Sequence, residues 1–340
     1  MKFDVVIGNP PYQERAKGES TRDEPIYHHF VDISYQLSDL VILITPGRFL
    51  FDAGQTPKSW NEKMLKDTHL RVVMYEKDSS KIFPRTDIKG GIAIILRDTN
   101  HEYDAIGIFT PYPILKTLLQ KINITKNNFS EMVSSQGLYR FSEEAFNKQE
   151  RIVANTGKGT GKKITSKLFA MLDDVFLDSV TNKDNYLGIM GLVDGKRSYK
   201  FINKNYIQDN EYVKNYKVIV PKSNGNGDFG EVLSSPIVMG PNEVSTDTFL
   251  SVGPVVSMDE ANAILKYLKS KFLRSLLGVK KVTQDNPRSV WQLIPMQDFT
   301  DTSDIDWSQS INEIDHQLYK KYHLTYDEIK FIEDNVQEME

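Results

Sequence analysis

The chain has 340 residues, a net charge of −4 and no cysteine. Its length favours two domains with a sizeable buried core. The absence of cysteine excludes disulfides and thiolate metal sites, and it is typical of the reducing cytoplasm, where we expect the protein. No run of about 18 apolar residues and no signal peptide occur, so the sequence predicts no membrane association.

Charge is unevenly distributed along the chain. Residues 1–121 carry no net charge, residues 122–300 carry +4, and residues 301–340 carry −8. A basic middle segment followed by an acidic tail is the pattern expected for a DNA-reading segment followed by a solvated helical tail.

The chain begins with a short apolar run, Val5–Ile7, that Gly8 ends and Asn9-Pro10-Pro11-Tyr12 follows. The run is typical of a buried parallel strand. A loop that leaves the carboxyl end of such a strand is where open α/β sheets place ligand chemistry. We therefore predict that Asn9–Tyr12 is a catalytic loop, with a Pro-Pro turn that merely ends a strand as the alternative.

The residue types in this loop fit transfer of a methyl group to a planar exocyclic amine. Such an amine is a poor nucleophile because its lone pair is delocalised into the ring. The side-chain oxygen of Asn9 and the carbonyl of Pro10 can accept its two N–H bonds and hold the nitrogen nearer tetrahedral. Pro10 and Pro11 stiffen the backbone, and Tyr12 offers a flat face on which a flipped base can stack.

Four strands are predicted in this part of the chain, at residues 4–8, 40–45, 70–76 and 90–97. Helices are predicted at 25–38 and near 58–67. The alternation of strand and helix predicts a parallel α/β sheet, and the strand led by Gly90-Gly91 is expected to be its antiparallel partner. The pattern loosens after Lys121, where we place a domain boundary.

Residues 3–13, FDVVIGNPPYQ, resemble motif IV of the gamma-class DNA adenine methyltransferases, the group of TaqI-type and type IIG restriction-modification methylases. Residues 40–51, 69–76 and 81–98 resemble, in order, later strands of that Rossmann-like catalytic domain. The Ile-Phe-Pro before the Gly-Gly strand looks like motif VIII, whose aromatic closes the other face of the adenine pocket, and here that residue would be Phe83. Asn-Pro-Pro-Tyr also occurs in methyltransferases that act on protein glutamine or on RNA guanine.

The resemblance implies S-adenosylmethionine as methyl donor and no metal. In that family an F-x-G-x-G-like loop holds the cofactor and precedes motif IV by many tens of residues. Only Met1-Lys2-Phe3-Asp4 stands before the strand here. We therefore expect a fragment, a split subunit or a degenerate gene without the main cofactor motif, and a partner polypeptide that carries the cofactor-binding half or a nuclease.

Two glycine clusters are candidates for a relocated cofactor loop. Gly225-x-Gly227-x-x-Gly230 matches a dinucleotide fingerprint, but residues 231–243 do not have a helical pattern, and such a loop must open a helix. Residues 157–163 are similar to a phosphate loop but have the wrong spacing, and a flexible basic loop is favoured. The cofactor-binding residues therefore remain unassigned.

Residues 122–300 show short mixed strands, Gly/Asn-rich turns and one amphipathic helix at about 258–277, and they resemble the α+β target-recognition domains of TaqI-like enzymes. Basic residues interleaved with aromatics predict contact with double-stranded DNA, the alternative being an ordinary solvated face. The candidates are Lys158, Lys162, Lys163, Lys167, Lys196 and Arg197. Residues 301–340 form a C-terminal segment in which two helices are predicted over 308–338, the second with a Thr325…Glu328 capping box.

The sequence thus predicts the catalytic-loop half of an adenine methyltransferase (1–121), a DNA target-recognition domain (122–300) and a helical tail (301–340). In the complete enzyme, Tyr12 and Phe83 would stack on a flipped adenine whose 6-amino group receives the methyl. The alternatives are a non-catalytic DNA-binding or specificity subunit or remnant, and a protein-glutamine or RNA methyltransferase.

Overall fold

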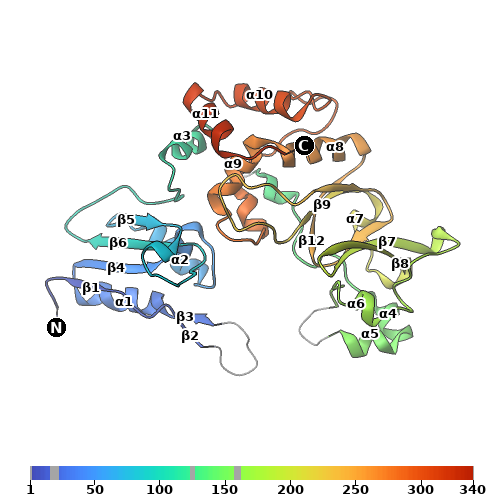
Figure 1. Cartoon of the computed structure of the whole chain (residues 1–340), viewed down its shortest axis with the longest axis horizontal. Helices are drawn as coiled ribbons and strands as arrows, with labels where there is room; N and C mark the ends of the chain where they lie inside the picture. The colour runs from blue at the N-terminus through green and yellow to red at the C-terminus, as the bar shows by residue number, and fades with distance from the viewer. Residues whose placement is uncertain (1, 16–22, 123–126, 157–161, 340) are drawn as a thin grey trace. The chain divides into compact units, whose positions relative to one another are not determined.

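The structure is a computed structural model that describes residues 2–15, 23–122, 127–156 and 162–339. The chain divides into two compact units, Met1–Thr117 and Leu118–Glu340 (Figure 1). Helix α3 (Pro113–Ile122) spans this boundary. Both units mix helices with strands, and the sheets contain parallel as well as antiparallel pairs, so the mixed α/β class predicted from the sequence is confirmed.

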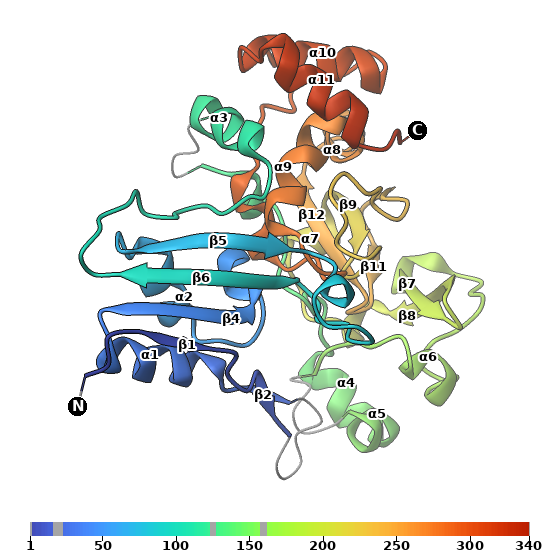
Figure 2. The ribbon, with the colours of Figure 1, turned by 60° about the vertical axis from the view of Figure 1, so that its left-hand side comes forward.

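The sheet of the first unit has the order β1-β4-β6-β5. Its strands are β1 (Val6–Gly8), β4 (Leu40–Pro46), β5 (Leu70–Glu76) and β6 (Ile92–Asp98). Strand β1 pairs in parallel with β4, whereas β6 is antiparallel to both β4 and β5. The predicted antiparallel last strand is therefore confirmed, and β1, β4 and β5 all run in the same direction (Figure 2).

Helices α1 (Tyr27–Leu37) and α2 (Lys58–Lys66) lie close to their predicted limits. The short helix η1 (Gly47–Phe51) follows β4, and the two-residue strands β2 (Gln13–Glu14) and β3 (Glu24–Pro25) pair after the first loop. The ring of Trp60 in α2 lies 5.8 Å from that of Tyr27 in α1 and 5.4 Å from that of Phe49 in η1, so side chains from these three helices share one core.

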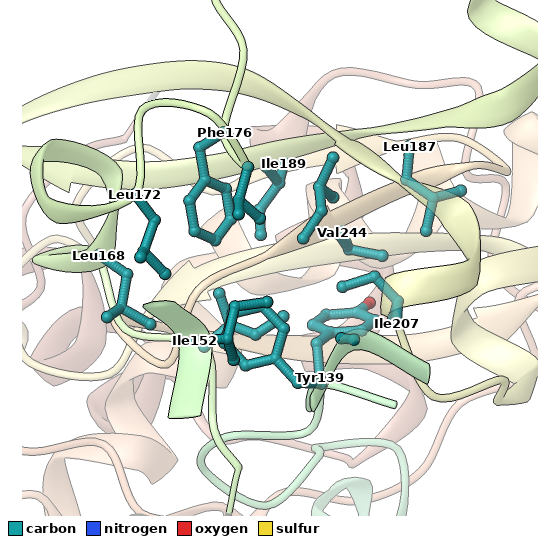
Figure 3. Packing of buried hydrophobic residues seen from close by; sticks show 14 of the residues in the cluster. Tyr139, Ile152, Leu168, Leu172, Phe176, Leu187, Ile189, Ile207 and Val244 are labelled. Carbon is teal, nitrogen blue, oxygen red and sulfur yellow. The ribbon is translucent and has the colours of Figure 1, made fainter. Parts of the chain in front are cut away.

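The second unit contains two three-stranded sheets, with the orders β11-β7-β8 and β10-β9-β12. The first consists of β7 (Tyr186–Val193), β8 (Lys196–Asn203) and β11 (Glu243–Ser245). The second consists of β9 (Tyr216–Pro221), β10 (Ile237–Met239) and β12 (Phe249–Val255). Buried side chains such as Tyr139, Phe176 and Ile189 pack into one core that includes β7 and β11 (Figure 3).

Short helices connect these elements. They are α4 (Glu143–Lys148), α5 (Glu150–Asn155), α6 (Leu168–Met171) and α7 (Glu211–Lys214). Five further 3₁₀ turns are η2 (Ser79–Lys81), η3 (Phe129–Glu131), η4 (Lys183–Asn185), η5 (Lys204–Tyr206) and η6 (Arg288–Leu293).

The single helix predicted at 258–277 is wrong, because the structure has two, α8 (Met258–Lys269) and α9 (Lys271–Lys280). Ser270 separates them with an extended ψ of 144°, and its hydroxyl accepts a hydrogen bond from the Leu273 N–H at 3.1 Å. The continuous apolar stripe concealed this break, since a serine can cap a helix as readily as it can lie within one.

The two helices predicted over 308–338 are confirmed as α10 (Ile311–Lys321) and α11 (Tyr326–Asn335). Each begins with a capping box, Ser310 with Glu313 and Thr325 with Glu328. They pack on α8 and α9 within the second unit. The three-part division at residues 121 and 300 stays a prediction. Among the helices of the described residues, none has the length and apolar character needed to cross a membrane.

Candidate active site and nucleic-acid interface

The predicted adenine-site segments all lie at the end of the first unit's sheet where β1, β4 and β5 finish. Since β1, β4 and β5 run in the same direction, the segments that follow them leave the sheet at the same edge (Figure 2). These segments are the Asn9–Tyr12 loop, helix η1 and the β5–β6 loop (residues 77–91), which carries Phe83. The topology therefore brings Asn9, Tyr12 and Phe83 to one side of the sheet.

The Asn9–Tyr12 loop starts where Gly8 is in register with Leu43 of β4. Asn9 is exposed, and its amide has no hydrogen-bond partner among the described residues. The Tyr12 carbonyl accepts a hydrogen bond from the Ile26 N–H at 3.1 Å, which fixes the far end of the loop next to the β2–β3 pair. The loop is thus held at both ends while the Asn9 side chain stays available.

Tyr12 has a half-buried side chain whose hydroxyl is buried without a partner in the described part of the chain. Burial raises the pKa of this hydroxyl to about 12, so Tyr12 is protonated at neutral pH. Tyr12 can therefore contribute a ring face and a hydrogen-bond donor, but not a phenolate base.

Phe83 is held by a compact network within the β5–β6 loop. Its N–H donates to the Ser79 carbonyl at 2.8 Å, and its carbonyl accepts from the Thr86 N–H at 3.2 Å and the Thr86 hydroxyl at 2.6 Å. The Ser79 hydroxyl in turn donates to the Thr86 carbonyl and accepts from the Ile88 N–H. A half-buried aromatic ring is thereby placed on a loop of fixed shape.

The Gly90-Gly91 pair closes this loop onto the end of β4. Both residues have positive φ, 83° and 72°, and a side chain on either would collide with its neighbours. A Cβ on Gly90 would lie 2.6 Å from Cγ of Arg48, and one on Gly91 would lie 2.5 Å from the Glu76 carbonyl. The Gly47 N–H donates to the Gly91 carbonyl at 2.8 Å, which ties the β5–β6 loop to helix η1.

The outer edge of β1 is apolar and open. In the described part of the chain, β4 is the only strand that pairs with β1. Ile7 is 71% exposed, and Phe3 and Val5 are also exposed along the same segment. Phe30 and Ile33 present further exposed apolar side chains on α1. An edge of this kind is a template for pairing with another strand.

The Gly225–Gly230 loop is already occupied by a carboxylate of the protein. Glu231 accepts hydrogen bonds from the N–H groups of Asn226 at 2.9 Å, Gly227 at 3.2 Å and Asp228 at 3.3 Å. Successive N–H groups that converge in this way form an anion-binding nest. Lys281, which is 2% exposed, pairs with the same carboxylate.

Glycine is needed at two positions of this loop because a side chain there would collide with the backbone of another segment. A Cβ on Gly227 would lie 2.3 Å from the Thr283 nitrogen, and one on Gly230 would lie 2.3 Å from the Asn335 carbonyl. No helix follows the loop, since the next element is β10. The described residues here do not fit S-adenosylmethionine. Sequence reasoning missed Glu231, although an acidic residue directly after the third glycine was a visible signal.

The first basic cluster lies partly outside the described residues, because Lys158 does. Lys162 pairs with Glu143, and its ammonium lies 4.9 Å from the centre of the Phe146 ring. Lys163 forms a backbone bridge with Arg140. Lys167 is exposed just before α6. Within the described part, Lys163 and Lys167 have no hydrogen-bond or ion-pair partner for their ammonium groups.

The second basic cluster is at the β7–β8 hairpin. Its two-residue turn consists of Asp194 and Gly195, both with positive φ, and Lys196 is exposed directly after it. The Arg197 guanidinium instead donates to the carbonyls of Ser234 and Ser235 and lies 5.8 Å from the centre of the Phe249 ring. Burial lowers the pKa of Arg197. Arg197 is exposed, but its guanidinium is held by these carbonyls and supports the hairpin.

Within the described residues, no group of three His, Cys, Asp or Glu side chains is placed to hold a metal ion. The residues that the topology brings to this end of the sheet offer hydrogen-bond acceptors and aromatic rings. Asn9 and the Pro10 carbonyl supply the acceptors, and Tyr12 and Phe83 supply the rings.

Comparison with known proteins places a similarity on this same part of the chain. Residues 1–83 match the family model of the Eco57I restriction-modification methylase. A segment of 105 residues is 30% identical to an uncharacterized adenine-specific methylase of Mycoplasma pneumoniae, and it covers 30% of this chain and 25% of that protein.

Two solved structures are also similar, at 9% identity. The type IIG restriction endonuclease BpuSI gives a TM-score of 0.32 over 93% of this chain and 48% of that chain. The type IIL restriction-modification enzyme MmeI in complex with DNA gives 0.40 over 97% and 56%. The chain thus spans less than two thirds of the length of each of these relatives. The part of it that carries Asn9–Tyr12 and Phe83 is similar to restriction-modification methylases.

Proposed function

We propose that this chain supplies the adenine-binding half of a gamma-class DNA adenine methyltransferase of a restriction-modification system. The observation that carries the proposal is the sheet topology, which brings the Asn9–Tyr12 loop and the Phe83 loop to the same end of the sheet, where β1 and β5 finish. The Asn9–Tyr12 loop and Phe83 itself lie within residues 1–83, the segment that matches the methylase family model.

In this proposal the 6-amino group of a flipped adenine donates its two N–H bonds to the Asn9 side-chain oxygen and the Pro10 carbonyl. These acceptors stabilise the positive charge that develops on the nitrogen when it is methylated. The exposed, unpartnered amide of Asn9 supports this role. Tyr12 and Phe83 stack on opposite faces of the base, which replaces the stacking lost when it leaves the duplex.

S-adenosylmethionine is the methyl donor that the family similarity suggests. The one dinucleotide fingerprint in the chain is filled by Glu231, so its residues do not fit that cofactor. We infer that a segment carrying the cofactor site pairs with the open edge of β1. The exposed apolar side chains of Val5 and Ile7 would be buried by such pairing.

DNA recognition is assigned to the second unit. Of the basic residues predicted to contact DNA, Lys163, Lys167 and Lys196 have ammonium groups without partners in the described residues, so these three can contact phosphates. Lys162 and Arg197 are engaged within the protein and would contribute charge at most. Solvated lysines are common on protein surfaces, so this assignment rests on the proposed function of the first unit.

The proposal is tested by expressing the chain with the polypeptide that carries the cofactor half in a host whose DNA lacks N6-methyladenine. We expect N6-methyladenine at one recurrent sequence, detected by mass spectrometry and long-read sequencing. The Asn9→Ala variant should remove the signal, whereas Asn312→Ala, which alters an exposed amide on α10, should retain it. Absence of methyladenine in the wild-type complex would reject the enzyme and favour a DNA-binding subunit. Methylated glutamine or RNA guanine would favour the other methyltransferase classes.

A further inference from the structure

Arg85 has a backbone conformation that its side chain does not explain. Its φ is 68°, in the left-handed region that favours glycine. It occupies the third position of the Phe83–Thr86 turn, with Pro84 in the second position and a hydrogen bond from the Thr86 N–H to the Phe83 carbonyl. A type II turn of this kind takes glycine or asparagine at that position. Folding alone would therefore be served better by glycine.

The turn cannot relax to relieve this strain. Ser79 fixes it from one side through its hydrogen bonds with Thr86 and Ile88, and the Phe83 N–H donates to the Ser79 carbonyl. A residue that persists in a sparsely populated region of φ and ψ, on a loop fixed by its surroundings, indicates a functional constraint.

The Arg85 guanidinium is also without a partner. The β5–β6 loop has a net charge of +2, from four basic and two acidic residues. Lys81 pairs with Glu76 at 3.5 Å, Lys89 pairs with Asp87 at 2.9 Å, and Lys77 also has an interaction. Among the described residues, Arg85 is the one cation of this loop with no hydrogen bond or ion pair, and its side chain is exposed.

We propose that Arg85 binds a backbone phosphate of the DNA strand whose adenine is flipped, an inference that rests on the proposed function. Arg85 lies two residues after Phe83, the ring assigned to the base, on a turn that fixes the spacing between them. A flipped nucleotide carries its flanking phosphates with it to the pocket. The planar guanidinium matches the two oxygens of a phosphate, which a lysine would meet only as a point charge.

The test uses the Arg85→Gly variant of the full chain, together with Arg85→Lys. Arg71→Gln is the matched control, because it removes one charge at the opposite end of the same sheet, near the start of β5. Binding to a fluorescein-labelled 30-base-pair duplex is measured by anisotropy at several salt concentrations, and thermal unfolding is measured in parallel. A second duplex of unrelated sequence shows whether the effect depends on the bases.

We expect Arg85→Gly to melt at the same temperature as the wild type or higher, since glycine adopts positive φ freely. Its plot of log affinity against log salt should lose about 0.9 of its slope, which corresponds to about eightfold weaker binding at 0.1 M salt, on both duplexes. Arg85→Lys should retain the slope but bind more weakly, and Arg71→Gln should bind like the wild type.

A slope for Arg85→Gly equal to that of a DNA-binding wild type would overturn the phosphate contact and leave the proposed function intact. Lower thermal stability of Arg85→Gly would show a structural role and also overturn it. Loss of affinity on one duplex only would assign Arg85 to a base. A wild-type chain that does not bind DNA would overturn the inference and the assignment of DNA recognition together.

Discussion

The carboxylate of Glu231 should be a main determinant of stability in the second unit. It accepts from three backbone N–H groups of residues 226–228 and pairs with the buried ammonium of Lys281. The perturbation is Glu231→Ala, which leaves the three donors unsatisfied and the Lys281 charge without its counter-ion. Glu338→Ala, on the exposed C-terminal tail, is the matched control.

The size of the effect follows from what remains after the substitution. Removing one partner of a buried ion pair costs about 3–5 kcal/mol. Lys281 would keep two acceptors, the carbonyls of Asn224 at 3.0 Å and Thr283 at 3.2 Å. Glu231 is also 12% exposed at its side chain, so water can partly replace it. We therefore expect the lower end of the range, a loss of about 3 kcal/mol in the free energy of unfolding.

Two further variants separate charge from packing. Glu231→Gln keeps an acceptor oxygen, and since charge-assisted hydrogen bonds are about twice as strong as neutral ones, it should cost about half as much. The double variant Glu231→Ala/Lys281→Met removes both charges and should cost less than the two single variants together.

Urea unfolding followed by tryptophan fluorescence measures these differences. A Trp60→Phe background leaves Trp291 and Trp307, both in the second unit, as the reporters among the three tryptophans of the chain. A Glu231→Ala cost below about 1 kcal/mol, similar to that of an ordinary surface substitution, would refute the anion-nest reasoning. Strict additivity of the double variant would refute the coupling to Lys281.

The remaining predictions concern the first unit. Asn9→Ala in the complete enzyme should abolish methylation while DNA binding stays nearly intact, and near-normal turnover would contradict the motif assignment. Tyr12→Ala should weaken binding to duplexes that carry a flipped target base by roughly 1–3 kcal/mol, because base–aromatic stacking is lost, whereas Tyr12→Phe should bind as well as the wild type because the hydroxyl has no described partner. The isolated chain should bind S-adenosylmethionine weakly at best, and micromolar stoichiometric binding in calorimetry would point to a site that we have missed. Ile7→Lys should reduce self-association of the isolated chain in sedimentation experiments, and unchanged association would show that the β1 edge is not the contact surface.

The sheet of the first unit could be predicted well because each strand carries its own local signal. The runs 40–45 and 70–76 are apolar and end in turn residues, and Gly90-Gly91 marks the start of the reversed strand. Strand β1 was predicted at 4–8 and spans Val6–Gly8. A strand is assigned only where its backbone pairs. In the described residues β1 pairs on one side only, with β4 over Val6–Gly8, which explains its shorter length.

The helix break at Ser270 and the state of the glycine loop could not be read from the sequence, because both depend on contacts between distant residues. Ser270 ends α8 where Asp315, 45 positions later in the chain, accepts hydrogen bonds from the first N–H groups of α9. The glycine loop needs Lys281 and the backbone of Asn335 to define its shape. The local hydrophobic periodicity of the sequence indicates none of these distant partners.

The basic residues show the same distinction between composition and geometry. Lys162, Lys163, Lys196 and Arg197 are equivalent in a charge count, yet two of them are held by partners within the protein. A count overstates the charge available to a phosphate, because a guanidinium that already donates to two carbonyls must break those bonds to bind elsewhere. Arg85 could not be identified from the sequence for the converse reason: it stands alone between a proline and a threonine, and only its positive φ distinguishes it from an ordinary solvated surface arginine. Lys162, Ser235 and His323 also have positive φ, so the DNA contact proposed for Arg85 depends on the combination of positive φ with an exposed, unpaired guanidinium two residues from Phe83.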